Sequence, residues 1–262
     1  MQDDPAWFAH LAGVAVAVSE SAAEIVREQL GRAIELGRKT SPTDVVTQTD
    51  IDAESHIRAR LHELAPGSRV IGEENGASGS HERGVVWIVD PLDGTVNFTY
   101  HLPLVAVSVA ASVDGRVVAG AVVDVVHGET FAASLYGGAT LDGAVLAGSQ
   151  CRALDHALVA TGFSYSADQR LHQGAVIAEL LPKTRDIRCF GSAAVQMCWV
   201  AAGRVDAYFE RDTKVWDYAA AALVAAEAGM TVELPCPEND GLCAAAPAML
   251  FDALRTCIES AA

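Results

Sequence analysis

Two apolar segments joined by a short polar turn place the strongest constraint on the fold. Residues 104–113 and 117–125 are mostly Val and Ala, and Asp114-Gly115-Arg116 separates them. An Asp-Gly pair between two apolar runs is the strongest short-range signal for a β-hairpin. Neither run reaches the roughly 18–20 residues that a membrane helix needs. The sequence therefore predicts a hairpin within a sheet, and we expect no association with a membrane.

The two halves of the chain differ in pattern. Apolar residues at helical spacing predict a helix over 6–36, a loop at 37–46, and a second helix that begins at Thr49 or Asp50 and ends at Pro66-Gly67. Strands are predicted at 85–89 and 129–133. After about residue 150, strands predicted at 157–161, 205–210 and 242–245 alternate with helices at 168–181, 192–202, 217–228 and 247–258. We therefore expect an α+β sub-domain over residues 1–148 and an α/β sub-domain over residues 149–262.

The charge balance narrows the class of partner. The chain has 262 residues, with 18 Lys and Arg against 34 Asp and Glu, a net charge of −16. A surface this acidic repels phosphate backbones, so direct binding of nucleic acid is not expected. Some of the carboxylates can instead be grouped in a functional site.

The cysteines and the N-terminal residues indicate the cellular compartment of the protein. The six cysteines form no CxxC pair and have no zinc-site spacing. They are typical of the reduced thiols of a cytoplasmic protein, although Cys236 and Cys243 could pair. The acidic N-terminus lacks the basic region of a signal peptide. We therefore expect a cytoplasmic protein.

Acidic residues gather at three places in the chain. Asp90 and Asp93 follow the apolar strand predicted at 85–89, Gly72-Glu73-Glu74 stands about seventeen residues earlier, and Asp217 opens a predicted helix. Each place alone has an ordinary interpretation, because Asp-Gly is usually a turn, Glu-Glu a solvated pair, and Asp before a helix a cap. Together they supply hard oxygen ligands without histidine or cysteine, which suits Mg²⁺, Mn²⁺ or Ca²⁺.

Converging carboxylates need a counter-charge, since their mutual repulsion would otherwise protonate some of them. Two divalent cations would supply it and would attract phosphate. A pair of metals about 3.5–4 Å apart can activate a water on one side and stabilise a leaving alkoxide on the other. The acidic residues therefore favour a metal-dependent phosphate site.

Longer motifs carry a resemblance to a known family. Trp87–Phe98 (WIVDPLDGTVNF), Val215–Gly229 (VWDYAAAALVAAEAG), Gly72–Glu74, Thr43–Asp50 and Gly191–Glu210 occur in order and spacing over nearly the whole chain. The sequence resembles the inositol monophosphatase family of Mg²⁺-dependent, Li⁺-sensitive phosphatases, and within it the bacterial, actinobacterial members. The resemblance implies a layered αβαβα sandwich of the inositol monophosphatase and fructose-1,6-bisphosphatase type. It also implies a homodimer.

Site roles follow from the resemblance residue by residue. It places Glu73, Asp90 and the Leu92 carbonyl oxygen on a first Mg²⁺, and Asp90, Asp93 and Asp217 on a second; Glu73 can also contact a third, weaker metal. On this division most metal ligands lie in residues 1–148, and Asp217 lies in residues 149–262. Mn²⁺ or Ca²⁺ can occupy the same sites.

The resemblance assigns the remaining residues to the water and to the substrate. Thr95, with Asp50 behind it, would orient and deprotonate the attacking water, since a hydroxyl alone is a poor base. Gly94 and Thr95 would hold phosphate oxygens through backbone N–H groups. The residues expected to contact the substrate alcohol are Asp93, Gly191, Ser192, Ala193, Glu210 and Asp217.

Ordinary interpretations of these residues stay open. Asp50, Thr95 and Ser192 can each be helix caps, and Glu210 can be a solvated strand end. Lys39 can be a surface lysine or part of a lid. Arg211-Asp212-Thr213-Lys214 departs from the small or apolar residues that relatives often carry, so its two cations can hold a second phosphate or pair with acids.

The sequence leaves three functions to compare. The first is a Mg²⁺-dependent phosphomonoesterase acting on myo-inositol 1-phosphate or a similar polyol phosphate. The second is the same chemistry on fructose 1,6-bisphosphate, histidinol phosphate or a 3′-phosphonucleotide. The third is a non-catalytic partner in a protein complex, which the complete ligand set argues against.

Overall fold

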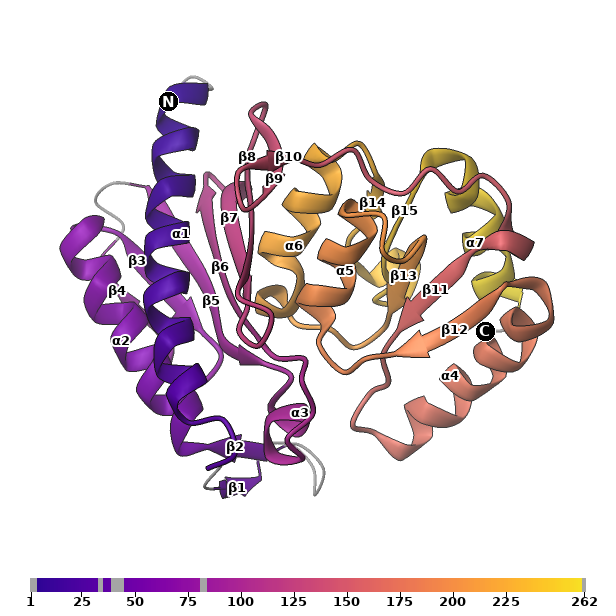
Figure 1. Cartoon of the computed structure of the whole chain (residues 1–262), viewed down its shortest axis with the longest axis horizontal. Coiled ribbons are helices and arrows are strands. Elements are labelled where there is room, and N and C mark those ends of the chain that lie inside the picture. Colours follow the sequence, from indigo (N-terminus) through magenta and orange to yellow (C-terminus); the bar gives the residue numbers. More distant parts are fainter. Residues whose placement is uncertain (1–3, 33–34, 39–44, 81–83, 261–262) are drawn as a thin grey trace.

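The protein forms five layers of alternating helices and sheets (Figure 1). The structure is a computed structural model that describes residues 4–32, 35–38, 45–80 and 84–260. Helices α1 (Pro5–Glu28) and α2 (Gln48–Leu64) cover one face of an eight-stranded sheet. Helices α5 (Ala193–Ala201) and α6 (Val215–Glu227) lie between that sheet and a five-stranded sheet, whose far face carries α4 (Ala167–Leu180) and α7 (Ala248–Ser260).

The larger sheet is built mainly from antiparallel neighbours. Its strand order is β10-β9-β8-β7-β6-β5-β3-β4, and β3 and β5 form its one parallel pair within the described residues. The predicted hairpin is confirmed, because Asp114-Gly115 joins β6 to β7. The bounds are β3 Arg69–Gly72, β4 Gly76–Gly79, β5 Val85–Asp93, β6 Ala106–Val113, β7 Arg116–Asp124, β8 Glu129–Ser134, β9 Gly138–Leu141 and β10 Ala144–Val145.

The smaller sheet has the strand order β12-β11-β13-β15-β14. Strand β11 (Leu158–Thr161) is parallel to both β12 (Asp186–Cys189) and β13 (Ala207–Glu210). Strands β15 (Cys243–Ala246) and β14 (Thr231–Glu233) complete the sheet by antiparallel pairing. Helix α3 (Thr95–Thr99), the strand pair β1 (Glu35–Arg38) and β2 (Val45–Thr47), and short 3₁₀ turns at Leu154–His156, Leu181–Lys183 and Pro237–Asn239 complete the described elements.

Helix α1 is the core helix of the outer layer. The Asp4 side chain accepts hydrogen bonds from the N–H groups of Ala6 and Trp7, and Pro5 occupies the first turn, where its missing N–H costs nothing. By length and composition α1 is apolar enough to cross a membrane. However, a stripe of its side chains, including Leu11, Val18 and Val26, is buried against the sheet and α2. This packing accounts for its apolar character.

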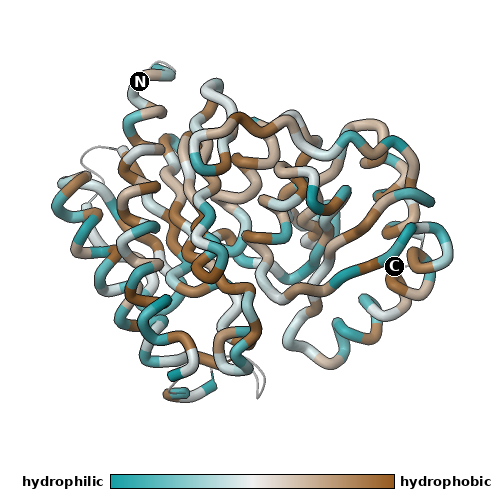
Figure 2. The backbone as a smooth tube through the Cα atoms, in the orientation of Figure 1, coloured by the Kyte–Doolittle hydropathy of each residue, from teal (hydrophilic) through white to brown (hydrophobic). Residues whose placement is uncertain are grey.

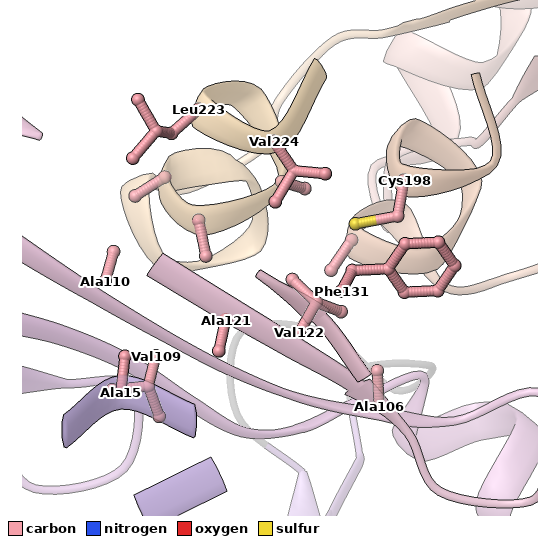
Figure 3. Close-up of a cluster of buried hydrophobic side chains, with 14 of the residues drawn as sticks. Ala15, Ala106, Val109, Ala110, Ala121, Val122, Phe131, Cys198, Leu223 and Val224 are labelled. Carbon is pink, nitrogen blue, oxygen red and sulfur yellow. The ribbon is translucent and has the colours of Figure 1, made fainter. Parts of the chain in front are cut away.

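Small side chains allow α6 to lie close to the larger sheet. A Cβ atom at Gly120 of β7 would lie 2.9 Å from Ala220 Cα, so a larger residue there would push the helix away. Figure 3 shows Leu223 and Val224 of α6 and Cys198 of α5 above Ala121, Val122 and Phe131 of the sheet. In Figure 2, hydrophobic (brown) segments run along the central strands, while the outer helix α2 carries many hydrophilic (teal) segments. Close packing here fixes α5 and α6, whose N-terminal ends reach the site described below.

Several predicted elements are wrong in extent. The first helix ends at Glu28 rather than at residue 36, because the chain turns at 29–31 and Gly31 has a φ of +78°. The segment predicted as a loop at 37–46 contains parts of β1 and β2, while Lys39 and Ser41-Pro42 lie outside the described residues. Strand β5 continues past residue 89 to Asp93.

Other predictions concern strands, thiols and the domain boundary. Short strands β4, β12 and β14 had no strong sequence signal. Cys236 and Cys243 are free thiols, the first exposed and the second buried. The boundary at residue 148 stays a prediction, since α5 and α6 from the second half pack on both sheets.

Candidate active site

The end of strand β5 carries two buried carboxylates. Pairing between β5 and β6 is irregular between Asp90 and Asp93, where Pro91 removes one N–H donor. Asp90 is 2% exposed and its Oδ1 accepts a hydrogen bond from the Leu92 N–H at 3.0 Å. Gly94 follows with a φ of +92°, and a Cβ there would lie 3.0 Å from the Leu104 carbonyl oxygen. Glycine therefore allows the turn that directs both acids to one edge of the sheet.

Asp93 lies at the N-terminus of α5, far away in sequence. Its Oδ2 accepts hydrogen bonds from Ser192 Oγ at 2.5 Å and from the Ala194 N–H at 2.8 Å, and its Oδ1 accepts one from the Ala193 N–H at 3.2 Å. A helix N-terminus stabilises a negative charge. Ser192 also caps the helix by accepting from the Val195 N–H. The structure thus brings the predicted substrate residues Ser192 and Ala193 to Asp93.

Thr95 and Asp50 are in contact, as their predicted roles require. Thr95 Oγ1 lies 3.1 Å from Asp50 Oδ1 and 3.0 Å from the Leu92 carbonyl oxygen. The other oxygen of Asp50 accepts from Thr47 N at 2.8 Å and Thr47 Oγ1 at 2.5 Å. Asp50 is fully buried and Thr95 is 9% exposed. Asp50 therefore serves as a cap of α2 and contacts Thr95 at the same time.

Asp217 approaches from the first turn of α6. Its Oδ2 accepts a hydrogen bond from the Lys214 N–H at 2.6 Å, which is a capping contact, and the side chain is half-buried. Glu73 follows β3 in a turn and is also half-buried. The negative charges of Glu73, Asp93 and Asp217 all raise the pKa of Asp90. The three predicted acidic segments therefore meet at one place.

The electrostatics of this group favour a bound proton or a bound cation over bare carboxylates. Burial, followed by the neighbouring carboxylates, raises the pKa of Asp90 well above its usual range. Burial is also the main cause that raises the pKa of Asp93, to about 6, and it raises the pKa of Asp217 well above its usual range. No Lys or Arg within the described ranges forms an ion pair with these three residues. Burial without a counter-charge is costly for a carboxylate.

The carboxylate oxygens of these acids are suitable ligands for hard divalent cations, although they do not surround a single point. Among the residues that the structure describes, no group of three or more His, Cys, Asp or Glu side chains is placed closely enough to hold a metal ion as it stands. Each of Asp90, Asp93 and Asp217 already accepts at least one hydrogen bond within the protein. Their chemistry, oxygen ligands of excess negative charge, is what Mg²⁺, Mn²⁺ and Ca²⁺ bind.

Glu210 ends strand β13 on the other side of the site. Its Oε2 accepts a hydrogen bond from the Tyr208 hydroxyl at 3.0 Å. The side chain lies over Gly162, where a Cβ would be 2.2 Å from the Glu210 carboxyl carbon. Burial, with the charges of Asp93 and Asp212, raises the pKa of Glu210 to about 7. The alternative interpretation of Glu210 as a solvated strand end does not describe its surroundings, because Glu210 is half-buried and accepts a hydrogen bond from Tyr208. Its contact with the substrate stays a prediction.

Gly191 belongs to a clamp between the two halves. Asn97 Nδ2 donates to the carbonyl oxygens of Leu104 at 2.8 Å and Phe190 at 2.6 Å. A Cβ at Gly191, whose φ is +81°, would lie 2.8 Å from Asn97 Oδ1. The absence of a side chain at Gly191 thus allows Asn97 to hold the loop before α5 against the end of β5.

Sequence reasoning missed Glu54. This residue is fully buried on α2, and its carboxylate accepts hydrogen bonds from Arg58 Nε at 2.8 Å, the Glu74 N–H at 2.8 Å and the Asn75 N–H at 3.1 Å. It therefore holds the turn that carries Glu73. The available signal was the spacing of four residues from Asp50 to Glu54 and from Glu54 to Arg58, which places all three on one face of a helix.

Comparisons with known proteins show to which family the chain belongs. The model of the inositol monophosphatase family matches residues 7–256. The chain belongs to the inositol monophosphatase family. The inositol-1-monophosphatase of Mycobacterium leprae is 46% identical over 233 residues, which covers 84% of this chain and 80% of that protein. Membership in the phosphatase family, and a relationship to actinobacterial members, are therefore confirmed.

Solved structures of family members confirm the fold. Mycobacterium tuberculosis SuhB is 40% identical and superposes with a TM-score of 0.83, covering 99% of this chain and 98% of that one. The layered αβαβα sandwich expected of this family is therefore correct. Another relative, the Nus factor SuhB of Escherichia coli, is 40% identical over 198 residues and is covered to 74% of its length.

Proposed function

We propose that this inositol monophosphatase family member hydrolyses phosphomonoesters of polyols, with myo-inositol 1-phosphate as the first substrate to test. The name of the Mycobacterium leprae relative supports this substrate. The observation that carries the proposal is the contact between Thr95 and Asp50 beside the buried carboxylates of β5. A hydroxyl and its base next to a group that needs divalent cations form the elements of a metal-dependent phosphatase.

The metal ligands are proposed from the resemblance and from the donor chemistry. Glu73, Asp90 and the Leu92 carbonyl oxygen would hold one Mg²⁺, and Asp90, Asp93 and Asp217 a second, with Glu73 near a third. When bound, the cations would neutralise these acids, attract the phosphate and lower the pKa of water. Mn²⁺ or Ca²⁺ would find the same oxygen ligands.

Thr95 would orient the attacking water and Asp50 would receive the proton. The Thr95 hydroxyl has a single hydrogen and two acceptors within reach, Asp50 Oδ1 and the Leu92 carbonyl oxygen. If the hydrogen points to Asp50, the Leu92 carbonyl oxygen is left for its proposed cation. The Thr95 oxygen can then accept a hydrogen bond from water while Asp50 acts as the base behind it.

The substrate would lie between the two sheets. The N–H groups of Gly94 and Thr95 are proposed to donate to phosphate oxygens. Asp93, Gly191, Ser192, Ala193, Glu210 and Asp217 are proposed to surround the alcohol. Ser192 and Ala193 would act through Asp93, to which both donate in this structure.

Cytoplasmic location and a homodimer remain proposals that rest on the resemblance and on the sequence, as do Li⁺ sensitivity and the absence of nucleic-acid and membrane partners. A second candidate function is membership in a protein complex, which the name of the Nus factor SuhB of Escherichia coli favours. With a net charge of −16, a basic protein is a better partner for such a role than RNA. The carboxylate set favours the phosphatase.

The test is phosphate release from a panel of substrates. The purified protein is assayed with myo-inositol 1-phosphate, fructose 1,6-bisphosphate, histidinol phosphate and a 3′-phosphonucleotide, each with Mg²⁺ and with excess chelator. We expect the highest kcat/KM for the inositol ester and no release in chelator. A higher kcat/KM for another ester would change the substrate, and release in chelator would overturn the metal-dependent reaction.

A further inference from the structure

A cleft of about 300 Å³ opens beside Glu210, on the face of the smaller sheet that α4 covers. Thr161 and Glu210, which line it, are the last residues of the parallel neighbours β11 and β13. In open α/β sheets, ligands bind outside the carboxyl ends of parallel strands. The position of the cleft is therefore typical of a binding site, and through Glu210 it adjoins the proposed alcohol side.

The lining is mainly apolar with a few oriented polar groups. Phe163, Val176, Ile177 and Phe209 supply apolar surface. Gln173 is more than nine-tenths buried, and its Oε1 accepts from the Ser164 N–H at 2.9 Å, which fixes the orientation of the amide. Its Nε2 has no hydrogen-bond partner within the described chain. An apolar cleft with a few convergent polar groups is characteristic of small-molecule sites.

The charges of the cleft disfavour an anion. Arg211 donates to the carbonyl oxygens of Asn239 at 3.0 Å and Asp240 at 2.6 Å, and to the Asp240 carboxylate at 2.9 Å. The guanidinium is thus already paired with an acid. A second phosphate would meet the carboxyl groups of Glu210 and Asp240 in the same cleft. The structure thus shows the acid pairing that the sequence offered as one interpretation of Arg211.

We propose that this cleft binds a neutral, partly apolar ring carried by the alcohol of the substrate. The proposal rests on the proposed function, and it adds to it a preference for polyol phosphates that carry such a substituent. The ring would pack on Phe163 and Phe209, and Glu210 would accept a hydrogen bond from a hydroxyl beside it. The second phosphate group of a bisphosphate would not bind favourably in the cleft.

A matched pair of substrates tests the proposal. Glycerol 2-phosphate and 1-O-benzylglycerol 2-phosphate share the reacting ester and differ in one neutral ring. Because burial of an aromatic ring in an apolar cleft is favourable, kcat/KM should be about tenfold higher for the benzyl ester. His172 lines the cleft and is exposed on α4, so His172→Trp should fill the cleft without disturbing the core. Leu171→Trp, on the same helix outside the lining, is the control.

His172→Trp and Phe163→Ala should each reduce the preference to about twofold or less, while kcat/KM for glycerol 2-phosphate stays within twofold of wild type. Leu171→Trp should keep the preference. Equal kcat/KM for the two esters in the wild type, or an unchanged preference in His172→Trp, would overturn the proposal.

If neither these two esters nor any ester of the panel above is hydrolysed, the proposed function fails, and saturation-transfer NMR with 1-O-benzylglycerol tests the cleft alone. Loss of binding in His172→Trp but not in Leu171→Trp would support the cleft. No binding to the wild type, or equal binding to all three proteins, would contradict it.

Discussion

Asp93 at the end of β5 and Asp50 on α2 are held very differently from Glu210 at the end of β13. Asp93 accepts three hydrogen bonds, from Ser192, Ala193 and Ala194, and Asp50 accepts three from Thr47 and Thr95. Glu210 accepts one from Tyr208 and faces a cleft. The reacting side is therefore fixed by many contacts, while the alcohol side is fixed by few. Such a site can keep its chemistry while its alcohol specificity varies.

A large effect on kcat should come from Thr95 and Asp50, which are assigned to the attacking water. Thr95→Ala or Asp50→Asn should lower kcat about 10²- to 10³-fold, because water loses its orientation and its base. Thr95→Ser keeps the hydroxyl and should retain kcat within about tenfold. Steady-state phosphate release at saturating Mg²⁺ measures this. A Thr95→Ala enzyme with the kcat of wild type would remove the assigned role.

The pH dependence of the unfolding free energy should show that Asp93 has a raised pKa, unlike an exposed acid. Burial raises the pKa of Asp93 from 3.8 to about 6, so its stabilising contribution is complete below pH 4 and is lost as the pH rises through 6. In chelator, the unfolding free energy of wild type relative to Asp93→Asn should therefore fall by up to about 3 kcal/mol between pH 4 and 6.5. Chemical denaturation of both proteins over this range measures it.

Saturating Mg²⁺ should cancel that loss, since a ligand that binds only the folded state stabilises it. In chelator, the unfolding free energies of wild type and Asp93→Asn could instead change with pH in parallel. That result would show that burial does not raise the pKa of Asp93 in the folded protein.

A smaller effect is expected at Glu54, a positioning residue. Glu54→Gln should raise the Mg²⁺ concentration for half-maximal activity about tenfold, with a smaller change in kcat, because the turn that carries Glu73 loses its anchor. Glu63→Gln is the control, since Glu63 lies exposed on the same helix. A lower melting temperature with unchanged Mg²⁺ dependence would reduce Glu54 to a purely structural role.

The smallest effect is expected on the alcohol side. Tyr208→Phe removes the one described hydrogen bond to Glu210 and should raise KM for the polyol phosphate about two- to fivefold with kcat unchanged. Steady-state kinetics with the preferred ester measures both constants. A fall in kcat without a change in KM would place Tyr208 and Glu210 on the reacting side and would erase the contrast between the two regions.

Local signals in the sequence were sufficient for part of one side of this comparison. Asp90-Pro91-Leu92-Asp93-Gly94 follows a buried strand and contains its own turn, so this turn could be located from neighbouring residues, whereas a metal site was favoured only together with Glu73 and Asp217. The hairpin at Asp114-Gly115 and the cap at Ser192 were local in the same sense, and both are present.

What the sequence could not predict depends on distant partners. Glu54 becomes buried only because Arg58 and the turn after β3 surround it, and the cleft exists only where α4 meets β11 and β13. The first helix was predicted too long because its apolar spacing continues past Glu28, whereas the backbone turns before Gly31. Tertiary contacts override local propensity at such places.

The central claim is that the carboxylates at the end of β5 make a metal-dependent phosphatase, and Asp93→Asn tests it most directly. Asp114→Asn, in the exposed hairpin turn, is the matched control. Phosphate release from myo-inositol 1-phosphate is measured for wild type and both variants over a Mg²⁺ titration. The prediction is a loss of about 10³-fold or more in kcat/KM for Asp93→Asn and none for Asp114→Asn. Mg²⁺-dependent release by Asp93→Asn near the wild-type rate would contradict the account.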